Sequence, residues 1–539
     1  MRALARPLEV VAGAVVCLSV AVLVTGGWVV GGLSLTRPED LVLLLVGLVA
    51  LRLLVAPVTL PAVRPGRAVA IGVAVYALAM GFIVVTRHLA FRTHALDLGY
   101  YVQVVWSIAA GHGAYVTLPP MHAWGDHFSP VLYLLAPLGR WAPGGTALVI
   151  AQTLILAGGA VALYGLAARR LGTRPGAEQA AVGLALLYLV NPSLHGVNLR
   201  DIHPQAFTIP LVIAATLAFD TRRYGWCAAA LALTLGGRED CAVAVVGFGI
   251  LLALARGCWL AGGLLAALAV AVLFADVTWV MPYFRGSPYP HLHRYGHLGS
   301  SLGDILVTLA FRPWRWLAVV VTVKKLVYLG ALLAPFGFLP LLAPRALAAA
   351  LPGLALNLMS LDPILVNHRS QYVSFVLPFV ALAAVDGGAR LQAWSGSEAG
   401  DGGGGAPRAR LTLAGALAFG LLASVALTSR TVNDLARPRW MPTDGHGALR
   451  GLLDRIPPDA SVSTTERLVT QLAARREVYI FPQQFAAEDY VLERERVIAT
   501  TPPDVFSAKA FEVVARADGR PSRARASGGA QARRRSVLA

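Results

Sequence analysis

The sequence predicts an all-α polytopic membrane protein. Of its 539 residues, 56% are hydrophobic and only 14% are charged, and the mean hydropathy is +0.63, which is typical of chains that live in a bilayer. Apolar runs of helical length recur along most of the chain. The excess of Lys and Arg, 46 against 29 acidic residues, falls mostly in loops and a basic tail. It therefore indicates membrane orientation and gives no reason to expect a nucleic-acid partner.

The apolar runs predict a bundle of roughly 11–14 transmembrane helices. The first run follows Arg2 and Arg6 and is long for the apolar part of a signal peptide, so we interpret it as a retained span. Segments 128–139 and 303–322 are too short or too broken to cross, and we expect both at the interface. The expected spans lie near 8–33, 41–62, 68–86, 145–168, 178–191, 204–219, 224–237, 240–255, 258–281, 325–343, 346–360, 370–386 and 411–428.

Arginines in the short loops orient this bundle. By the positive-inside rule, the side that carries them is cytoplasmic, and so is the N-terminus. The longer loops 87–144, 191–203, 238–240, 283–324 and 360–369 then face outward. The orienting arginines are Arg64, Arg67, Arg169, Arg170, Arg174, Arg222, Arg223, Arg256, Arg345, Arg390, Arg408 and Arg410.

The same topology divides the chain into parts with different expected roles. A Gly-rich composition predicts a flexible linker, and an apolar stretch at Val478–Phe481 predicts a buried strand within a small extracytoplasmic α/β appendage. The arginine-rich end is disordered by composition. The parts are the N-terminal transmembrane helices (1–86), the first large extracytoplasmic loop (87–144), the transmembrane core (145–390), the linker (391–410), the last transmembrane helix (411–428), the appendage (430–515) and the tail (516–539).

The first outer loop contains the longest polar interval of the chain, and Asp97 lies within it. Ionisable groups beside the apolar slab usually mark a binding or catalytic site. The residues after Asp97 have the spacing of a helix that ends at Gly111. Asp97 therefore has two interpretations at this point, an N-cap of that helix or a residue that does chemistry.

Other acids are expected on the same face of the membrane. Asp126 and Asp201 could each be a helix cap, and the triplet Arg238-Glu239-Asp240 could be an exposed turn. A charged triplet near lipid costs on the order of several kcal/mol if it is unpaired. Gathering of these groups with several histidines on one face favours a binding site.

Asp201 and His203 have several possible roles. The pair could ligate a divalent cation, or the carboxylate could orient the imidazole as an acid–base pair. A polar loop that is capped at both ends is an alternative. His368 and Arg369, at the entrance of the span 370–386, could hold a phosphate at a helix N-terminus, or Arg369 could be an interfacial anchor.

A third polar patch has the spacing H-x-H-x3-H. Its histidines are His291, His293 and His297, with Arg294 between them. The spacing could bind zinc, but no acid or Cys lies near in sequence. A mobile loop that contacts phosphate or sugar is the favoured interpretation of this patch.

Taken together, these segments resemble a bacterial family of predicted membrane proteins, the domain of unknown function 2079 (DUF2079). The resemblance covers most of the chain from about 85 to 492. The stretches that carry it are Asp97-Leu98-Gly99 with Gln103 and Trp106, His127-Phe128-Ser129-Pro130, Asn191-Pro192 with His195, Asp201-x-His203-Pro204, Glu239-Asp240 after a basic residue, Pro340-Leu341-Leu342, His368 with Gln371-Tyr372, Ile456-Pro457 and Tyr479-Ile480-Phe481-Pro482.

That family is similar in layout to the GT-C glycosyltransferases, which have many spans and a catalytic Asp in a long first outer loop. The resemblance implies a GT-C-like bundle in the cell envelope, with Asp97 as that catalytic residue. It further implies a polyprenyl-phosphate sugar donor and an extracytoplasmic glycan, lipid or protein acceptor. In this chain the long first outer loop follows the third expected span and not the first, so the chain would have two more N-terminal helices than the GT-C layout.

On this hypothesis the polar residues take specific roles. Asp97 is the catalytic base, and Asp201 with His203 contributes to catalysis or binds a divalent cation such as Mg²⁺ or Mn²⁺. Two positive side chains, Arg238 and Arg369, are candidates for the donor phosphate. The expected substrate-binding set is Asp126, His127, Arg238, Glu239, Asp240, His368 and Arg369.

Two other function classes remain open from sequence. A transporter or flippase of a lipid-linked or anionic solute would need ionisable groups in the middle of spans, often in broken helices. An assembly partner that acts through the C-terminal part would leave the Arg238-Glu239-Asp240 triplet without a role. The clustering of charges at one edge of the apolar slab favours the enzyme.

Overall fold

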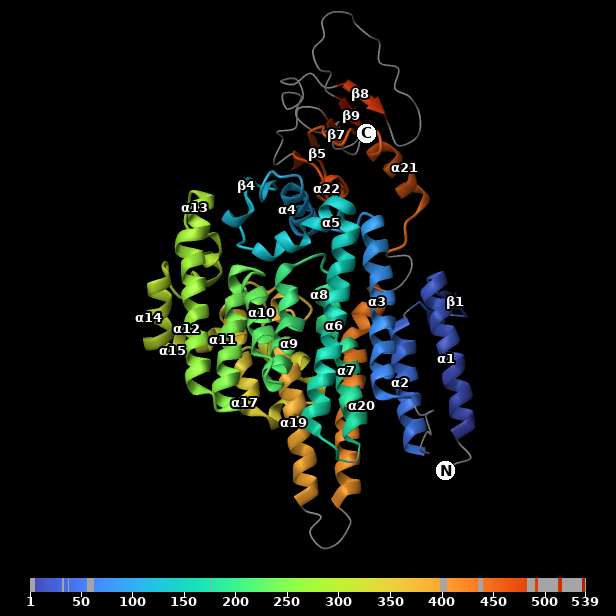
Figure 1. The fold of residues 1–539 in the computed structure, drawn as a ribbon. Coiled ribbons are helices and arrows are strands. Elements are labelled where there is room, and N and C mark those ends of the chain that lie inside the picture. Colours follow the sequence, from blue (N-terminus) through green and yellow to red (C-terminus); the bar gives the residue numbers. More distant parts are fainter. Residues whose placement is uncertain are drawn as a thin grey trace, which may run out of the picture.

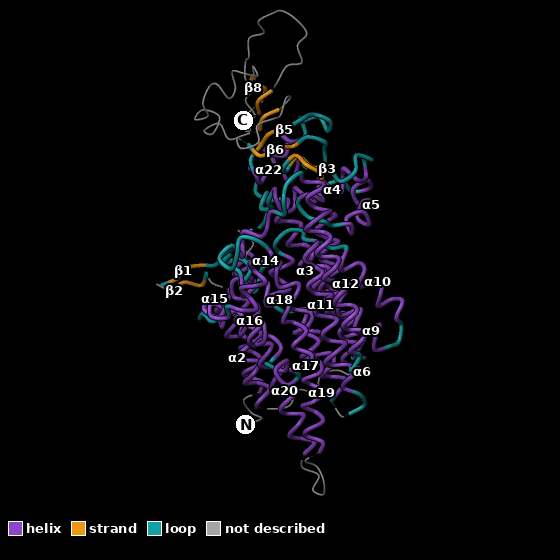
Figure 2. The backbone as a smooth tube through the Cα atoms, turned by 90° about the vertical axis from the view of Figure 1, so that its left-hand side faces the viewer, coloured by secondary structure: helices purple, strands orange, loops and turns teal. Residues whose placement is uncertain are grey.

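The computed structural model describes residues 5–31, 33–36, 38–55, 63–174, 176–397, 405–434, 440–481, 490–492, 512–515 and 536–538. The molecule is an elongated helical bundle, and a layer of short helices, loops and strands covers the end that is drawn uppermost in Figure 1. Figure 2 shows the same division from the side. The expected all-α class is confirmed, since the strands are short and lie outside the bundle.

Sixteen of the described helices form the bundle and its edges. They run mostly along its long axis (Figure 1). Their bounds are α1 (Ala5–Thr25), α2 (Pro38–Val55), α3 (Pro65–Leu89), α6 (Gly145–Leu171), α7 (Ala177–Leu189), α8 (Pro192–Asn198), α9 (Thr208–Asp220), α10 (Tyr224–Leu235), α11 (Ala242–Ile250), α12 (Trp259–Ala275), α13 (Met281–Arg285), α16 (Val323–Leu333), α17 (Pro344–Leu347), α18 (Leu351–Met359), α19 (Leu377–Ser397) and α20 (Gly405–Asp434).

Several of the expected spans are bent or short helices. Four helices within the described ranges are long and apolar enough to cross a membrane, and two bent pairs raise this number to six if each pair is one span. The expected span 178–191 corresponds to α7, and the chain bends by 41° just after it, where α8 begins, because Pro192 cannot continue the helical hydrogen bonds. Shorter apolar helices are Asp40–Val49, Pro204–Asp220, Tyr224–Leu235 and Leu413–Leu427.

The two segments expected at the interface consist of short helices. Residues 128–139 contain a 3₁₀ helix, Pro130–Leu135, that leads into α5 (Ala136–Trp141). Residues 303–322 contain α14 (Leu302–Phe311) and α15 (Pro313–Val320). Helix α15 forms the second bent pair with the helix that follows it, at 64°.

The first outer loop folds into a compact layer over the bundle. A π-helical turn, Ala95–Gly99, continues into α4 (Tyr100–Ala109). A hairpin of β3 (Tyr115–Thr117) and β4 (Pro120–His122) follows, with Val116 opposite Met121. These residues lack a strong alternation of apolar and polar side chains, so the hairpin is not apparent from the sequence.

The C-terminal part stands on this layer at the upper end of the molecule (Figure 1). It contains a parallel sheet of order β6-β5-β7-β9-β8 and two helices. The strand expected near Val478–Phe481 is β6 (Val478–Ile480), which pairs with β5 (Val462–Thr464). The other elements are α21 (Asp444–Leu453), α22 (Glu466–Leu472), β7 (Tyr490–Leu492), β8 (Glu512–Ala515) and β9 (Ser536–Leu538). Apart from β9, the expected disordered tail, 516–539, lies outside the described residues.

The two ends of the bundle differ in what they contain. The start of α1 and the ends of α19 and α20 that border 398–404 lie at the lower end in Figure 1, far from the C-terminal sheet. Helices α19 and α20 extend into the expected linker, 391–410, from both sides, and residues 398–404 lie outside the described ranges. At this lower end Arg170 binds Asp220 and Asp386 at 2.7 and 2.6 Å. A small hairpin of β1 (Trp28–Val30) and β2 (Leu33–Leu35) joins α1 to α2.

Candidate functional site

A cavity of about 530 Å³ lies where the first outer loop meets the upper end of the bundle. Its polar residues come from loops, from short helical turns and from α4, which the fold brings to one place. Its lining residues are Leu96, Asp97, Tyr100, Tyr101, Leu118, Pro119, Asp126, His127, His203, Arg238, Arg294, Asp362, Ile364, Gln371 and Tyr372.

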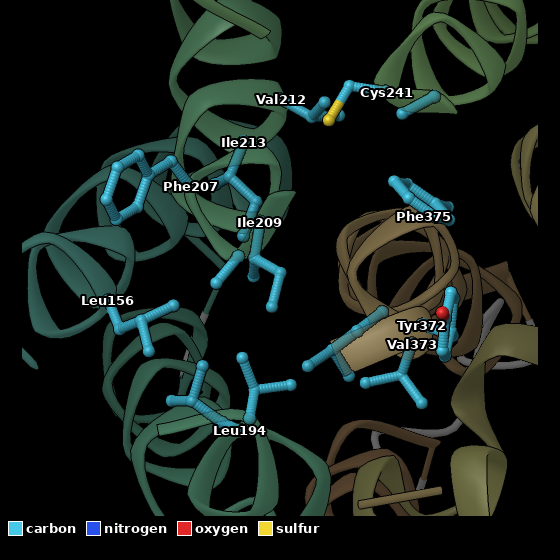
Figure 3. Close-up of a cluster of buried hydrophobic side chains, with 14 of the residues drawn as sticks. Leu156, Leu194, Phe207, Ile209, Val212, Ile213, Cys241, Tyr372, Val373 and Phe375 are labelled. Atoms are coloured by element: carbon cyan, nitrogen blue, oxygen red, sulfur yellow. The ribbon is translucent and has the colours of Figure 1, made fainter. Parts of the chain in front are cut away.

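The cavity rests on a tightly packed apolar core. Figure 3 shows Leu156 of α6, Leu194 of α8 and Ile209 of α9 directed toward the segment that contains Tyr372 and Val373. Leu156, Leu194 and Ile209 are fully buried. Because Tyr372 belongs both to this core and to the cavity lining, the core holds that side of the cavity in place.

Asp97 is not the cap of its helix. His94 is the N-cap residue of the turn Ala95–Gly99, so Asp97 lies in the first turn. Its Oδ1 is 3.1 Å from Nε2 of His203, and the Asp97 side chain remains 41% exposed while that of His203 is 4% exposed. The structure therefore places a carboxylate at the cavity surface and a buried imidazole behind it. This arrangement favours the interpretation of Asp97 as a functional residue over that of a cap.

The charge of Asp97 is maintained by its surroundings. Burial by itself would raise the pKa of this carboxyl, but the hydrogen bond from His203 and the nearby positive groups outweigh burial, so the pKa lies below its usual value. The carboxylate is thus ionised at neutral pH and can accept a proton.

Asp201 has a different partner from its sequence neighbour His203. It accepts hydrogen bonds from the backbone N–H of His94 at 2.8 Å and from the His94 ring at 3.3 Å. Gln152 of α6 fixes this loop, because its Nε2 donates to the carbonyl of Asp201 and its Oε1 accepts from the N–H of His203. The two residues of the predicted metal pair therefore have different partners: Asp201 contacts His94, and His203 contacts Asp97.

The contact with Asp201 also affects His94. The hydrogen bond to Asp201 raises the pKa of His94, although burial opposes the shift. The ligand atoms of His94, Asp97 and Asp201 lie within 4.8 Å of one another. Asp201 itself is buried and does not line the cavity.

Two arginines, Arg238 and Arg294, line the same cavity as Asp97. Arg238 is buried and forms a bidentate pair with Asp240, in which Nε lies 2.7 Å from Oδ1. Its guanidinium lies 5.6 Å from the centroid of the Tyr372 ring, and that of Arg294 lies 5.2 Å from the same ring. Cation–π contacts of this kind stabilise desolvated guanidinium groups. The cavity therefore contains fixed positive charge as well as a carboxylate.

Glu239 lies behind the lining and orients His127. The Glu239 side chain is 1% exposed, and its Oε1 is 3.1 Å from Nδ1 of His127. The backbone N–H of Phe128 donates to its other oxygen at 3.3 Å. Burial raises the pKa of Glu239 and lowers that of His127.

The structure brings together most of the residues predicted from sequence. Asp97, Asp126, His127, His203 and Arg238 line the cavity, and Glu239 and Asp240 contact lining residues. Asp201 instead contacts His94, which does not line the cavity. Whether they act in catalysis or binding remains a prediction.

His368 and Arg369 are the exceptions. Neither lines the cavity. Arg369 precedes a short 3₁₀ helix, Gln371–Phe375, whereas α19 begins only at Leu377. Arg369 therefore lies beside the start of this short helix and not beside that of α19, and its role in phosphate binding stays a prediction. The backbone of Arg369 instead packs closely against Gly196 of α8.

The cavity lining also contains polar residues that the expected catalytic and substrate-binding sets did not include, although Arg294 was part of the separate histidine-rich patch. Arg294, Asp362, Gln371 and Tyr372 all belong to the cavity. Arg294 lies in the histidine-rich patch, and Gln371-Tyr372 belongs to the stretches that carry the family resemblance, so both signals were present. No sequence pattern distinguished them from neighbours such as His368.

The C-terminal part is bonded to the first outer loop beside the cavity. The Thr117 hydroxyl lies 2.6 Å from the carbonyl of Val478, and Gln103 Nε2 donates to the carbonyl of Arg476 at 3.1 Å. A Cβ at Gly99 would lie 3.1 Å from Val469 of α22. Through these contacts the C-terminal part holds the helix that follows Asp97 in position.

Comparison with known proteins gives a family and a distant likeness. A family model described as "Predicted membrane protein (DUF2079)" matches residues 87–519. No curated protein matches the chain. Among solved structures, ArnT from Cupriavidus metallidurans in the apo state is 16% identical with a TM-score of 0.45 over 81% of this chain and 89% of that chain. The same protein bound to undecaprenyl phosphate is 15% identical with a TM-score of 0.43 over the same shares.

Proposed function

This chain belongs to the DUF2079 family of predicted membrane proteins, and we propose that it is an integral-membrane glycosyltransferase that uses a polyprenyl-phosphate-linked sugar donor. The observation that carries the proposal is the cavity in which ionised Asp97 shares a lining with Arg238 and Arg294. Sugar transfer from a lipid phosphate needs a base for the acceptor hydroxyl and positive charge for the departing phosphate. Both are present in this one space.

The proposed reaction is a single displacement with inversion. Asp97 accepts the proton of the acceptor hydroxyl, and the resulting oxygen attacks the anomeric carbon of the donor sugar. The bond between that carbon and the phosphate oxygen breaks, and the electron pair leaves with the polyprenyl phosphate. Arg238 and Arg294 stabilise the charge on that phosphate. His203 is a positioning residue, because it holds the Asp97 carboxylate by a hydrogen bond.

The reaction is written without Mg²⁺ or Mn²⁺ at Asp201 and His203. His203 Nε2 is directed to Asp97 and Asp201 to His94, so the two side chains do not converge on one ion. We place the cavity on the extracytoplasmic side, because the arginine-rich short loops lie at the opposite end of the bundle. The acceptor is then an extracytoplasmic glycan, lipid or protein.

The decisive variant is Asp97→Asn in the full-length protein, reconstituted with a polyprenyl-phosphate sugar. Asn is nearly isosteric, so expression and thermal stability should change little. Loss of the base is expected to lower turnover about a hundredfold or more. Asp304→Asn is the matched control. Asp304 is an exposed acid that takes part in the N-terminal cap of α14, and it does not line the cavity.

Two outcomes would contradict the proposal. Near-normal turnover in Asp97→Asn would remove the base from the mechanism. Movement of the lipid-linked sugar across the vesicle membrane without transfer to any acceptor would favour the transporter hypothesis instead.

A further inference from the structure

One cluster of metal-binding side chains lies at the edge of the cavity and takes no part in the proposed reaction. The ligand atoms of Asp126, His127 and His291 all lie within 4.8 Å of one another. Asp126 and His127 come from the first outer loop, whereas His291 belongs to the short 3₁₀ helix Pro290–Tyr295. The rings of His127 and His291 are stacked, with their centroids 4.9 Å apart.

We propose that Asp126, His127 and His291 form a zinc site that joins the first outer loop to the 3₁₀ helix Pro290–Tyr295. Two imidazoles and a carboxylate are a ligand set that zinc accepts, and the nitrogen ligands select zinc over magnesium or calcium. Three protein ligands leave one tetrahedral position open. Because Asp126 and His127 also line the cavity, the ion would border it.

Glu239 orients His127 for this role. Its buried carboxylate accepts the hydrogen bond from Nδ1 of His127, which leaves Nε2 as the metal-binding nitrogen. A carboxylate behind a ligating histidine is the usual arrangement around protein zinc, because it fixes the tautomer and the direction of the ring. The Tyr289 hydroxyl, 3.4 Å from the same Glu239 oxygen, adds a second contact.

His291 has a buried nitrogen that the protein leaves unsatisfied. Its Nε2 is shielded from solvent and has no hydrogen-bond partner among the described residues. Buried polar atoms are nearly always paired, so an orphan beside two other possible ligands indicates a missing partner. A zinc ion would supply it.

The local charge and distances are compatible with a divalent cation. The nearby charges balance, with Asp126, Glu239 and Asp240 against Arg238, Arg285 and Arg294. Zinc would therefore be held by its bonds to the ligand atoms and not by a surplus of negative charge. At zinc–ligand distances of about 2.0–2.1 Å, the ligand atoms of a tetrahedral site lie about 3.4 Å from one another, so those of this cluster would have to approach each other. The rings of His127 and His291 are within 12° of parallel, so at least one ring would also have to turn about its Cβ–Cγ bond for both nitrogens to point at one ion. Both changes are side-chain movements on a loop and a short helix.

Of the first two histidines in the pattern H-x-H-x3-H, only His291 belongs to the cluster. His293 is exposed and its Nδ1 contacts the carbonyl of Pro290 at 2.8 Å. It does not join the cluster. His293 therefore provides a control of the same residue type, two positions from a proposed ligand.

The test is zinc binding by the full-length protein, purified in detergent, stripped with a chelator and titrated with zinc against a chromophoric competitor. Wild type and His293→Ala are expected to bind about one zinc per chain. His291→Ala should lose this site, and Glu239→Gln should weaken it by about 10–100-fold. Cobalt should give the visible absorption of a tetrahedral site in wild type and not in His291→Ala.

The result does not depend on the proposed transferase activity, because no substrate is used. If His291→Ala is not monodisperse by gel filtration, His127→Gln replaces it in the same titration. Equal zinc affinity in wild type and in the folded ligand variant would overturn the proposal, as would the absence of stoichiometric zinc in wild type.

Discussion

At the scale of single residues, the partner of each acid decides what it can do. Asp97, Asp126 and Asp201 look alike in sequence, since each could cap a helix. In the structure Asp97 meets His203, Asp126 lies near Arg285, and Asp201 holds the backbone of His94. These partners are more than a hundred residues away along the chain. The sequence could predict that the acids share a face, but the individual pairings depend on side-chain geometry that no local pattern encodes.

The contact between Asp97 and His203 predicts a pH dependence of turnover. The native pKa of Asp97 lies below its usual value near 3.9, because the His203 hydrogen bond and the nearby positive groups together outweigh burial. The carboxylate should therefore stay active as pH falls until that lowered pKa is reached. His203→Leu removes the hydrogen bond, so burial then raises the pKa and the acid limb of the pH–rate profile should move to higher pH. An unchanged acid limb would show that the proton acceptor lies elsewhere.

The two arginines of the cavity should respond differently to substitution. Arg294 is partly exposed and its nearest acid, Asp362, is 3.8 Å away, so Arg294→Gln should raise KM for the lipid-linked donor with little change in stability. Arg238 is buried against Asp240, and Arg238→Gln leaves that carboxylate without its partner at a cost of about 3–5 kcal/mol. Donor titrations and thermal unfolding separate the two effects. Equal stability loss in both variants would contradict this assignment.

At the scale of elements, the site is assembled by broken helices and by close backbone contacts. The bend between α7 and α8 carries the chain toward the cavity, and α8 then packs on the segment that precedes Gln371–Phe375. Pro192 lies at this bend, but we expected a plain span there and did not predict the break. The docking of α22 on the helix of Asp97 could not be predicted, because it depends on Gly99 meeting Val469 across the fold.

Gly196 of α8 provides a test of this assembly. A Cβ there would lie 2.4 Å from the Cβ of Arg369 and 2.5 Å from its backbone, a distance at which the two segments must separate. Gly196→Ala should lower the free energy of unfolding by about 1–3 kcal/mol. Gly158→Ala in α6 is the control, since a Cβ at Gly158 meets nothing within 4 Å. Thermal unfolding of both variants in detergent compares them, and equal midpoints would refute the close contact.

At the scale of the whole molecule, polarity along the bundle axis is the main organising feature. The C-terminal sheet stands at one end of the bundle, and the ends of α19 and α20 that border 398–404 lie at the other (Figure 1). The cavity is lined by the first outer loop, on which that sheet stands, whereas Arg170, near the C-terminal end of α6, binds Asp220 and Asp386. Composition predicted the membrane class, and the loop arginines predicted which loops share an end. The number of spans was harder to predict, because short and bent helices lack the long apolar runs that define a span.

The direction of this axis across the membrane is the last expectation to test. The positive-inside rule places the cavity outside, so a cysteine at Tyr115 should react with a membrane-impermeant maleimide in intact cells. A cysteine at Thr173, at the arginine-rich end of α6, should react only after the membrane is permeabilised. Both residues are exposed, and the wild-type chain gives the background of the native cysteines. The reverse labelling pattern would put the cavity in the cytoplasm, where an extracytoplasmic acceptor could not reach Asp97.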